Sequence, residues 1–468
     1  MKKIINLPFL LIVLILFPIL VHGQTKLPSF FASNMVLQQN EQVAIWGMDN
    51  SKTSILVEGN WGESATATSD KEGNWKVKLK TPSAGGPFEL QIVGSDTVVL
   101  ENVLIGEVWL CSGQSNMEMP MKGFNNQPIN GSNEAILNSE NDQIRYFGAK
   151  RASSLSPETD IEGSWSLTDP STTGEFSATA YFFARKLNEI MEVPVGIMVT
   201  SWGGSSVEAW MDEETLKKYN DIEIPNALPE KSHQRTPTLL YNAMISPFIG
   251  FTIKGTIWYQ GESNRNNPEA YKKLFPDMIS LWRLKWGQGD FPFYFVQIAP
   301  YGYDGSNSAF LREAQLHAMN TVPNTGMAVT MDIGDCGYIH PREKRLVGER
   351  LVYWALAKAY DINGLAYSGP LYKSMEVNDG KVLLTFDYVK NGLSSFGMEI
   401  TGFQIAGEDK MFYPAMAIIN RNKSLTVWSS EVENPVAVRY AFDNCTPGSL
   451  YNIEALPASS FRTDDWEE

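Results

Sequence analysis

The sequence predicts a three-layer α/β domain flanked at both ends by β-sandwich-type domains. Between residues 104 and 362, short apolar segments typical of buried strands alternate with segments of helical periodicity. This alternation is expected for a largely parallel sheet covered by helices. Before residue 104, short and often alternating segments are separated by turns rich in Gly, Asn and Asp, which is typical of a β-sandwich, and from residue 363 onward short strand-like segments return. At 468 residues the chain is also too long for one ordinary core.

Residues 1–23 have the features of an export signal. Lys2 and Lys3 precede an apolar core at residues 9–20. We therefore expect a signal peptide at 1–23, an N-terminal β domain at 24–103, an α/β domain at 104–362 and a C-terminal β region at 363–468. No later stretch reaches the roughly 20 apolar residues of a membrane span. These features predict an exported protein, periplasmic or secreted, without stable membrane insertion.

The composition argues against a nucleic-acid partner. The chain has 38 Lys and Arg against 53 Asp and Glu, a net charge of −15, and no basic cluster. Its three cysteines match no zinc pattern, and in an oxidising compartment at most one intrachain disulfide can form. Cys111, close before Ser115, and Cys336, close before His340, could lie near each other.

The expected elements follow the chain in order. N-terminal strands are expected at 35–37, 42–46, 53–57, 74–79 and 88–92. In the α/β domain, strands are expected at 108–111, 195–200, 255–259, 293–297 and 327–331, and helices at 180–190, 271–286, 310–320 and 342–360. C-terminal strands are expected at 381–386, 403–405, 416–419, 424–428 and 437–440.

Four polar turns follow strands of the α/β domain. They lie at residues 112–116, 201–206, 260–264 and 332–341. The carboxyl ends of parallel strands share one edge of a sheet, where α/β proteins bind their ligands. We therefore expect the four turns to converge on one crevice.

The residues in these turns suit acyl transfer. A serine nucleophile, here Ser115, needs a nearby base, and histidine is the natural one near neutral pH. Three histidines lie beyond residue 23. His340 lies in a strand-end turn flanked by acids, whereas His317 has an apolar helical spacing and His233 lies in a polar loop. Donors for an oxyanion are expected from the Ser115 N–H, the backbone at residues 203–204, and the amide of Gln260 or Asn264.

Four ordered sequence blocks resemble those of the sialate O-acetylesterase family, in the SGNH-hydrolase superfamily. They are residues 113–117 (GQSNM), 202–204 (WGG), 258–264 (WYQGESN) and 332–341 (DIGDCGYIHP). Residues 240–247 and 456–464 are also similar to segments of that family. The resemblance implies a flavodoxin-like SGNH core, Ser115 as nucleophile, His340 as base and no metal or organic cofactor. The implied reaction removes O-acetyl groups from sialic acids or related acetylated sugars.

The chain departs from the superfamily pattern at the acid that orients the histidine. The pattern places an Asp three residues before the histidine, where this sequence has Gly337. The orienting acid is then Asp335, Asp332 or a group from elsewhere, unless Ser115 and His340 act as a dyad. We favour Asp335.

A second departure concerns the oxyanion site. The Gly-x-Asn block of the superfamily is replaced by residues 260–264, which leaves open whether Gln260, Glu262 or Asn264 faces the oxyanion. The negative charge of Glu262 would repel an oxyanion, so a supporting role suits it better. Gly204 is a further candidate for the oxyanion or substrate site, because glycine lets a ligand approach the backbone closely.

Substrate contacts are less clearly marked. Trp202, Trp210 and Tyr259 suit either a floor for a sugar ring or core packing. Arg312 suits either a sugar carboxylate or an internal ion pair. The alternative functions are an acetylxylan-type polysaccharide esterase and a non-catalytic carbohydrate-binding protein. The oligomeric state is not predicted.

Overall fold

One long strand, β7 (Thr97–Gly113), connects two of the three tiers in the computed structural model, which describes residues 24–466. Its first half pairs with β6 (Gly85–Val93) of the N-terminal tier, and its second half forms the centre of the α/β sheet. The boundary expected at 103/104 therefore falls inside a continuous strand. The signal peptide predicted at 1–23 lies outside the described residues.

The central sheet has the order β13-β12-β11-β7-β10-β8-β9. All neighbours pair in parallel except the edge strand β9. The strands besides β7 are β8 (Asn141–Ala149), β9 (Gly163–Thr168), β10 (Val195–Ser201), β11 (Gly255–Tyr259), β12 (Phe293–Val296) and β13 (Thr325–Ala328). The predicted α/β fold class is confirmed.

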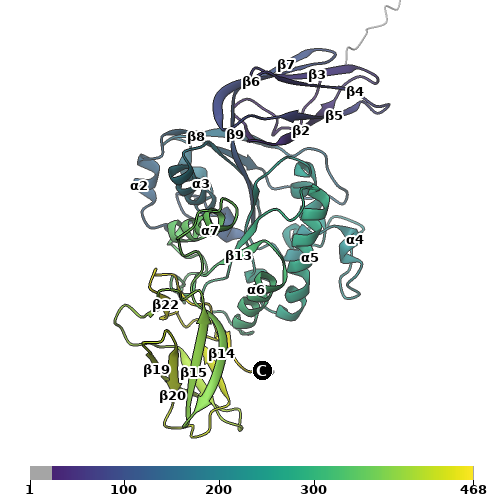
Figure 1. Ribbon diagram of the computed structural model, residues 1–468. Helices are drawn as coiled ribbons and strands as arrows, with labels where there is room; N and C mark the ends of the chain where they lie inside the picture. Colours follow the sequence, from purple (N-terminus) through teal and green to yellow (C-terminus); the bar gives the residue numbers. More distant parts are fainter. Residues whose placement is uncertain (1–23, 467–468) are drawn as a thin grey trace, which may run out of the picture.

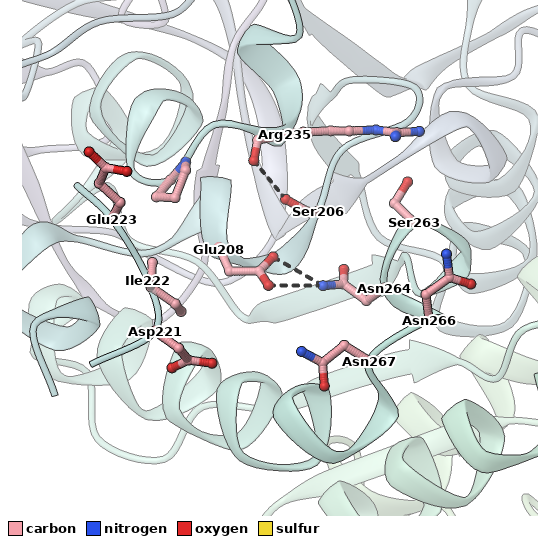
Figure 2. A pocket seen from close by; sticks show the side chains of 11 residues that line it. Ser206, Glu208, Asp221, Ile222, Glu223, Arg235, Ser263, Asn264, Asn266 and Asn267 are labelled. Carbon is pink, nitrogen blue, oxygen red and sulfur yellow. Dashed lines mark hydrogen bonds between the residues drawn. The ribbon is translucent and has the colours of Figure 1, made fainter. Parts of the chain in front are cut away.

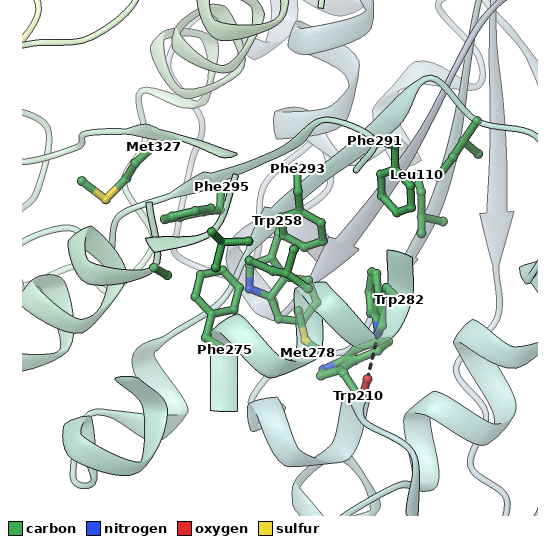
Figure 3. Close-up of a cluster of buried hydrophobic side chains, with 14 of the residues drawn as sticks. Leu110, Trp210, Trp258, Phe275, Met278, Trp282, Phe291, Phe293, Phe295 and Met327 are labelled. Atoms are coloured by element: carbon green, nitrogen blue, oxygen red, sulfur yellow. Dashed lines mark hydrogen bonds between the residues drawn. The ribbon is translucent and has the colours of Figure 1, made fainter. Parts of the chain in front are cut away.

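Helices cover both faces of this sheet (Figure 1). On one face lie α3 (Ala178–Met191) and α7 (Lys344–Lys358), and on the other α5 (Pro268–Trp286) and α6 (Ala309–Thr321). Successive strand residues point to opposite faces. Trp109 thus packs on Phe183 of α3, whereas Leu110 faces the cluster around Trp258 and α5, which Figure 3 shows.

The outer tiers consist of short antiparallel strands (Figure 1). The N-terminal tier also contains β1 (Val36–Gln38), which pairs in parallel with β7, and β2 (Gln42–Met48), β3 (Ser54–Gly59), β4 (Glu63–Thr68) and β5 (Asn74–Lys80). The C-terminal tier contains the four-stranded sheets β14-β15-β20-β19 and β18-β17-β21-β23. Its strands are β14 (Leu371–Asn378), β15 (Lys381–Asp387), β16 (Leu393–Ser394), β17 (Phe403–Ala406), β18 (Phe412–Pro414), β19 (Met416–Ile419), β20 (Leu425–Trp428), β21 (Ala437–Tyr440), β22 (Tyr451–Asn452) and β23 (Phe461–Arg462).

Three parallel strands end at the same level. Gly113, the last residue of β7, pairs with Ser201 at the end of β10 and with Tyr259 at the end of β11. Gly113 has φ +142°, and a Cβ there would lie 2.1 Å from the Tyr259 carbonyl oxygen. Glycine is therefore required for β11 to approach so closely. The chain then turns into the short helix α1 (Ser115–Glu118).

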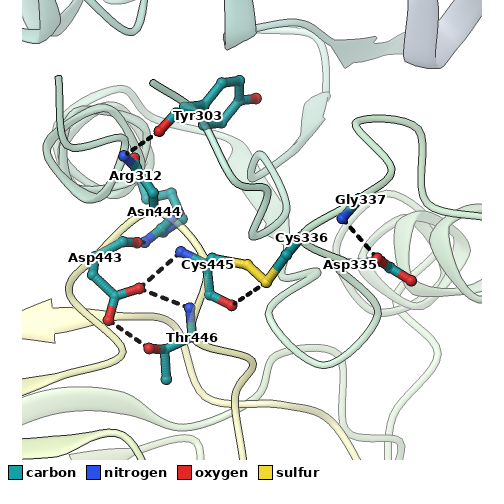
Figure 4. Close-up of a disulfide and its surroundings, with 9 residues drawn as sticks. All are labelled: Tyr303, Arg312, Asp335, Cys336, Gly337, Asp443, Asn444, Cys445 and Thr446. Carbon is teal, nitrogen blue, oxygen red and sulfur yellow. Dashed lines mark hydrogen bonds between the residues drawn. A yellow bond between two sulfur atoms is a disulfide. The ribbon is translucent and has the colours of Figure 1, made fainter. Parts of the chain in front are cut away.

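A disulfide connects the loop after β13 to the C-terminal tier (Figure 4). It joins Cys336 to Cys445, whose Cα atoms are 5.5 Å apart. Backbone hydrogen bonds from Tyr301 to Asn444 and from Gly302 to Cys336 reinforce the same junction. Cys111 is buried and unpaired, so the disulfide of Cys336 is with Cys445 and not with Cys111. Within residues 24–466, the helices are too short or too polar for a membrane span.

Candidate active site

The structure brings Ser115 and His340 into hydrogen-bond contact. Ser115 is the first residue of α1, directly after the turn at Gly113. His340 lies in the loop between β13 and α7. The Ser115 Oγ and His340 Nε2 atoms are 2.8 Å apart. A nucleophile and its base need this separation for proton transfer.

The other ring nitrogen of His340 contacts Gln127. The Nδ1 atom is hydrogen-bonded to the Gln127 side-chain oxygen. An amide oxygen only accepts, so Nδ1 carries the proton and Nε2 is free to accept one from Ser115. Phe124 packs edge-on against the imidazole, with ring centroids 5.3 Å apart. Gln127 and Phe124 are paired through their backbones, so one short loop positions both side chains.

The prediction of Asp335 as the orienting acid is therefore corrected. Its carboxylate accepts hydrogen bonds from Arg342, at 2.9 Å, and from the Gly337 N–H, at 2.8 Å. The alternative acid, Asp332, forms a two-pronged ion pair with Arg350, at 2.7 and 2.8 Å. Each acid is thus held by an arginine, Asp335 by Arg342 of the same loop and Asp332 by Arg350 of α7. Gln127 instead occupies the position beside Nδ1.

Burial controls the charge of the imidazole. Removal from water, together with the positive charge of Lys344, lowers the pKa of His340 to about 4. Burial also lowers the pKa of Lys344, which is fully enclosed, to about 7. The histidine is therefore neutral at pH 7, as a general base must be.

A buried network lies directly behind this pair. The Asn116 side chain donates to Glu262 Oε1 at 2.6 Å and to the Ile339 carbonyl oxygen at 3.2 Å, and it accepts from Lys344 Nζ. Burial raises the pKa of Glu262, against the effects of its hydrogen bonds and of Lys344. Asn116 and Ile339 are the sequence neighbours of Ser115 and His340. The network therefore ties the serine helix to the histidine loop, and the supporting role expected for Glu262 agrees with this placement.

The turn after β10 lies on the other side of Ser115. A Cβ on Gly203 would be 3.3 Å from the Ser115 Cβ, so glycine keeps this approach open. The Gly203 N–H donates to Glu118 at 2.8 Å. Trp202 is half-buried and packs under the guanidinium of Arg151. Gly204 has φ +75°, and its carbonyl oxygen accepts from Arg235.

Gln260 and Asn264 have structural contacts. Gln260 is fully buried, and its amide nitrogen donates to the Ser205 carbonyl oxygen at 3.0 Å and to Asn264 at 2.7 Å. The expected oxyanion role of this amide is therefore corrected. The Asn264 amide nitrogen donates to both carboxylate oxygens of Glu208, at 3.0 and 3.2 Å. Asn264 also reaches the wall of the neighbouring cavity.

That cavity has a volume of about 480 Å³ (Figure 2). Its wall combines charged, amide, hydroxyl and two apolar side chains: Ser206, Glu208, Asp221, Ile222, Glu223, Arg235, Pro237, Ser263, Asn264, Asn266 and Asn267. The volume is within the roughly 300–1,000 Å³ of small-molecule sites.

The remaining residues considered as substrate contacts or as the base have other, structural contacts. Arg312 is fully buried and bonded to Ser460 and two carbonyl oxygens of the C-terminal region, which corrects its suggested contact with a sugar. Trp210 and Tyr259 are core residues. His233 bonds to Ser153. In the part of the chain that the structure describes, no group of three His, Cys, Asp or Glu side chains could hold a metal ion.

Sequence reasoning missed Gln127, Asn116 and Lys344. Asn116 directly follows the predicted nucleophile, and this position in the sequence could have marked it as part of the site. Lys344 opens a helix that was predicted, but a lysine there normally faces solvent. Gln127 lies in an irregular loop, and no periodicity or spacing marks it.

Comparison with known proteins agrees with this geometry. Residues 105–355 match the family described as carbohydrate esterase, sialic acid-specific acetylesterase. The chain is 32% identical to the sialate O-acetylesterase of Mus musculus over 433 residues, which cover 77% of this chain and 79% of that protein. It is 32% identical to the Homo sapiens sialate O-acetylesterase over 410 residues, covering 78% and 76% of the two chains.

A solved structure is also similar over nearly the whole chain. The crystal structure of a carbohydrate acetylesterase from Xanthomonas citri superposes with a TM-score of 0.87 and 37% identity, covering 95% of this chain and 100% of that one. This chain belongs to the sialic acid-specific acetylesterase family of carbohydrate esterases.

Proposed function

We propose that this esterase hydrolyses acetyl esters of sugars with Ser115 as nucleophile and His340 as general base. The observation that carries the proposal is the 2.8 Å contact between Ser115 Oγ and His340 Nε2 at the edge where three parallel strands end. The substrates are O-acetylated sialic acids or related acetylated sugars, as the names of the relatives suggest.

The proposed reaction has two steps. His340 Nε2 accepts the Ser115 proton as Oγ attacks the acetyl carbonyl carbon, and the protonated histidine then gives that proton to the departing sugar oxygen. In the second step, His340 deprotonates a water molecule that attacks the acetyl-enzyme, and it gives that proton to Ser115 Oγ as the ester bond breaks and acetate leaves. Gln127 accepts from Nδ1–H throughout and so keeps the ring in the reactive tautomer.

The oxyanion needs donors that are already in place. The N–H of Ser115 precedes the first intrahelical hydrogen bond of α1 and is therefore available by geometry. The Gly204 N–H, in the turn that packs against Ser115, is the second candidate. Donors of this kind each contribute about 3–4 kcal/mol to lowering the barrier.

An acetylxylan-type polysaccharide esterase is the second candidate. The similar Xanthomonas citri protein is named a carbohydrate acetylesterase without restriction to sialic acid. Acetate release from a panel of acetylated sugars separates the two candidates.

We also propose that the protein acts outside the cytoplasm. The signal-like sequence of residues 1–23 and the Cys336–Cys445 disulfide support this location. Its presence in the medium or periplasmic fraction, lacking residues 1–23, is the corresponding measurement.

Replacing the nucleophile should abolish turnover without unfolding the protein. We expect Ser115→Ala to lower kcat for acetate release at least about 1,000-fold, because the attacking oxygen is gone. Ser51→Ala, in the exposed turn before β3, is the matched control and should retain wild-type kcat. Thermal melts of both variants should match the wild type. Substantial acetate release by Ser115→Ala would refute the assignment.

The Gln127 contact distinguishes the corrected site from the predicted one. Gln127→Ala should lower kcat by about 10- to 100-fold, because the imidazole loses its orienting partner. Asp335→Asn should stay within about fivefold of the wild type, since it disrupts only a half-exposed ion pair with Arg342. The opposite order of effects would restore Asp335 as the orienting residue.

The pH profile reports the charge of His340. Because only the neutral imidazole accepts a proton, kcat/KM should fall as the pH is lowered through the pKa of His340 in the free enzyme. That pKa is lowered from 6.5 to about 4 by burial and by Lys344. We therefore expect the acid limb to have its midpoint near pH 4. A midpoint near 6.5 would show that the imidazole is not shielded as described.

A further inference from the structure

The cavity beside Ser115 carries an excess of negative charge. Three carboxylates, those of Glu208, Asp221 and Glu223, line it together with one guanidinium, that of Arg235. None of the ion pairs among residues 24–466 includes any of these four side chains. We propose that this cavity binds an uncharged, hydroxyl-rich sugar unit of the acetylated substrate and disfavours a carboxylated one. The inference rests on the proposed esterase function and, of the two substrate candidates named there, favours the neutral acetylated polysaccharide over the sialic acid.

Two contacts connect the cavity to the nucleophile. On one side, Arg235 of the cavity wall donates through Nε to the Gly204 carbonyl oxygen at 3.2 Å, and the preceding residue, Gly203, packs against Ser115. On the other side, the N–H of Ser263, also in the wall, donates to the side-chain oxygen of Gln114 at 3.4 Å. Gln114 directly precedes Ser115. The cavity wall therefore contacts the segments on both sides of Ser115, although Ser115 and His340 are not among its lining residues. In this proposal, the sugar occupies the cavity and its acetyl group extends toward Ser115.

The polar wall suits sugar hydroxyl groups. A hydroxyl both donates and accepts, and carboxylates form strong hydrogen bonds with such donors. Figure 2 shows Asp221 and Glu223 at one end of the cavity, away from the Arg235 guanidinium at the other. The side chains of Asn266 and Asn267 offer both donors and acceptors along the same wall.

One part of the wall is already held in place. Glu208 accepts both hydrogen bonds of the Asn264 amide nitrogen, and the Asn264 oxygen accepts from the Val207 N–H at 2.9 Å. This arrangement fixes the Glu208 carboxylate before a ligand arrives. Preorganisation of this kind reduces the entropy lost on binding.

The same carboxylates that bind sugar hydroxyl groups would repel a sugar that carries a negative charge. A sugar carboxylate in the cavity faces three like charges, and like-charge contacts disfavour a ligand strongly. The single guanidinium is already bonded through Nε to Gly204, with its remaining N–H groups at one end. Charge therefore selects against sialic acids at this position.

The test compares two acetylated sugars and one acetyl ester without a sugar. The kcat/KM of the wild-type protein is measured for an acetylated neutral xylo-oligosaccharide, for O-acetylated sialic acid and for p-nitrophenyl acetate. We expect the neutral oligosaccharide to exceed the sialic acid at least about tenfold. A preference for the sialic acid, or equal values, would overturn the inference.

Removing the charge should change this selectivity. In the double variant Asp221→Asn and Glu223→Gln, kcat/KM for the neutral oligosaccharide, relative to p-nitrophenyl acetate, should fall about tenfold, because charge-assisted hydrogen bonds become neutral ones. The kcat/KM for O-acetylated sialic acid, also taken relative to p-nitrophenyl acetate, should rise. Glu230→Gln is the matched control and should leave both ratios unchanged. Glu230 is an exposed carboxylate between α4 (Glu213–Leu216) and η3 (His233–Arg235) and is not part of the cavity wall.

The two possible failures are distinct. The cavity does not select by charge if the double variant leaves the relative kcat/KM for the oligosaccharide unchanged. The same conclusion holds if the variant lowers the relative kcat/KM of both sugars equally. If the wild-type protein releases no acetate from any of the three compounds, or if Ser115→Ala releases it as fast, the proposed function itself fails.

Discussion

The contact between the Ser115 hydroxyl and the His340 imidazole depends on how closely three parallel strands end together. The two residues are 225 positions apart in the chain. Gly113 allows β11 to approach β7 without a side chain between them, and α1 starts immediately afterwards. A larger residue at Gly113 would displace Ser115 together with the turn, so the geometry of the site is set by backbone packing.

The histidine loop has few regular hydrogen bonds of its own and is held from three directions. Asn116 binds the Ile339 carbonyl from behind, Gln127 binds the ring from the side, and the disulfide at Cys336 connects the loop to the C-terminal tier. The C-terminal tier thus contributes to the position of a residue in the α/β domain. A neutral amide beside Nδ1 also agrees with the low pKa of His340, because an amide, unlike a carboxylate, carries no charge that would stabilise the protonated form.

The parts of this structure that depend on local pattern could be predicted from the sequence. Ser115 and His340 follow apolar strands, and the shared edge of a parallel sheet brings such positions together. Asp335 shows the limit of this reasoning: it lies in the correct loop, but Arg342, seven residues later, takes its carboxylate. Sequence proximity identifies acids near a histidine but not which partner each acid has. The same holds for the cysteines, since the position of Cys445 depends on how a separate tier packs.

Gln127 and the cavity could not be predicted because both depend on irregular loops. The loop that carries Gln127 is placed by its packing on the imidazole and by a backbone hydrogen bond from Asn130 to Arg342. The cavity wall combines residues from the turn after β10, from the segment around Asp221 and from the turn after β11. Side chains from such distant segments form a site only after the sheet has set their positions.

Labelling with a fluorophosphonate, followed by mass spectrometry of the digested protein, tests the central claim most directly. These reagents phosphonylate a serine hydroxyl that a neighbouring base activates. We expect one adduct, on the peptide that contains Ser115, and its loss in His340→Ala with the fold retained. No adduct on Ser115, or equal labelling without the imidazole, would contradict the account.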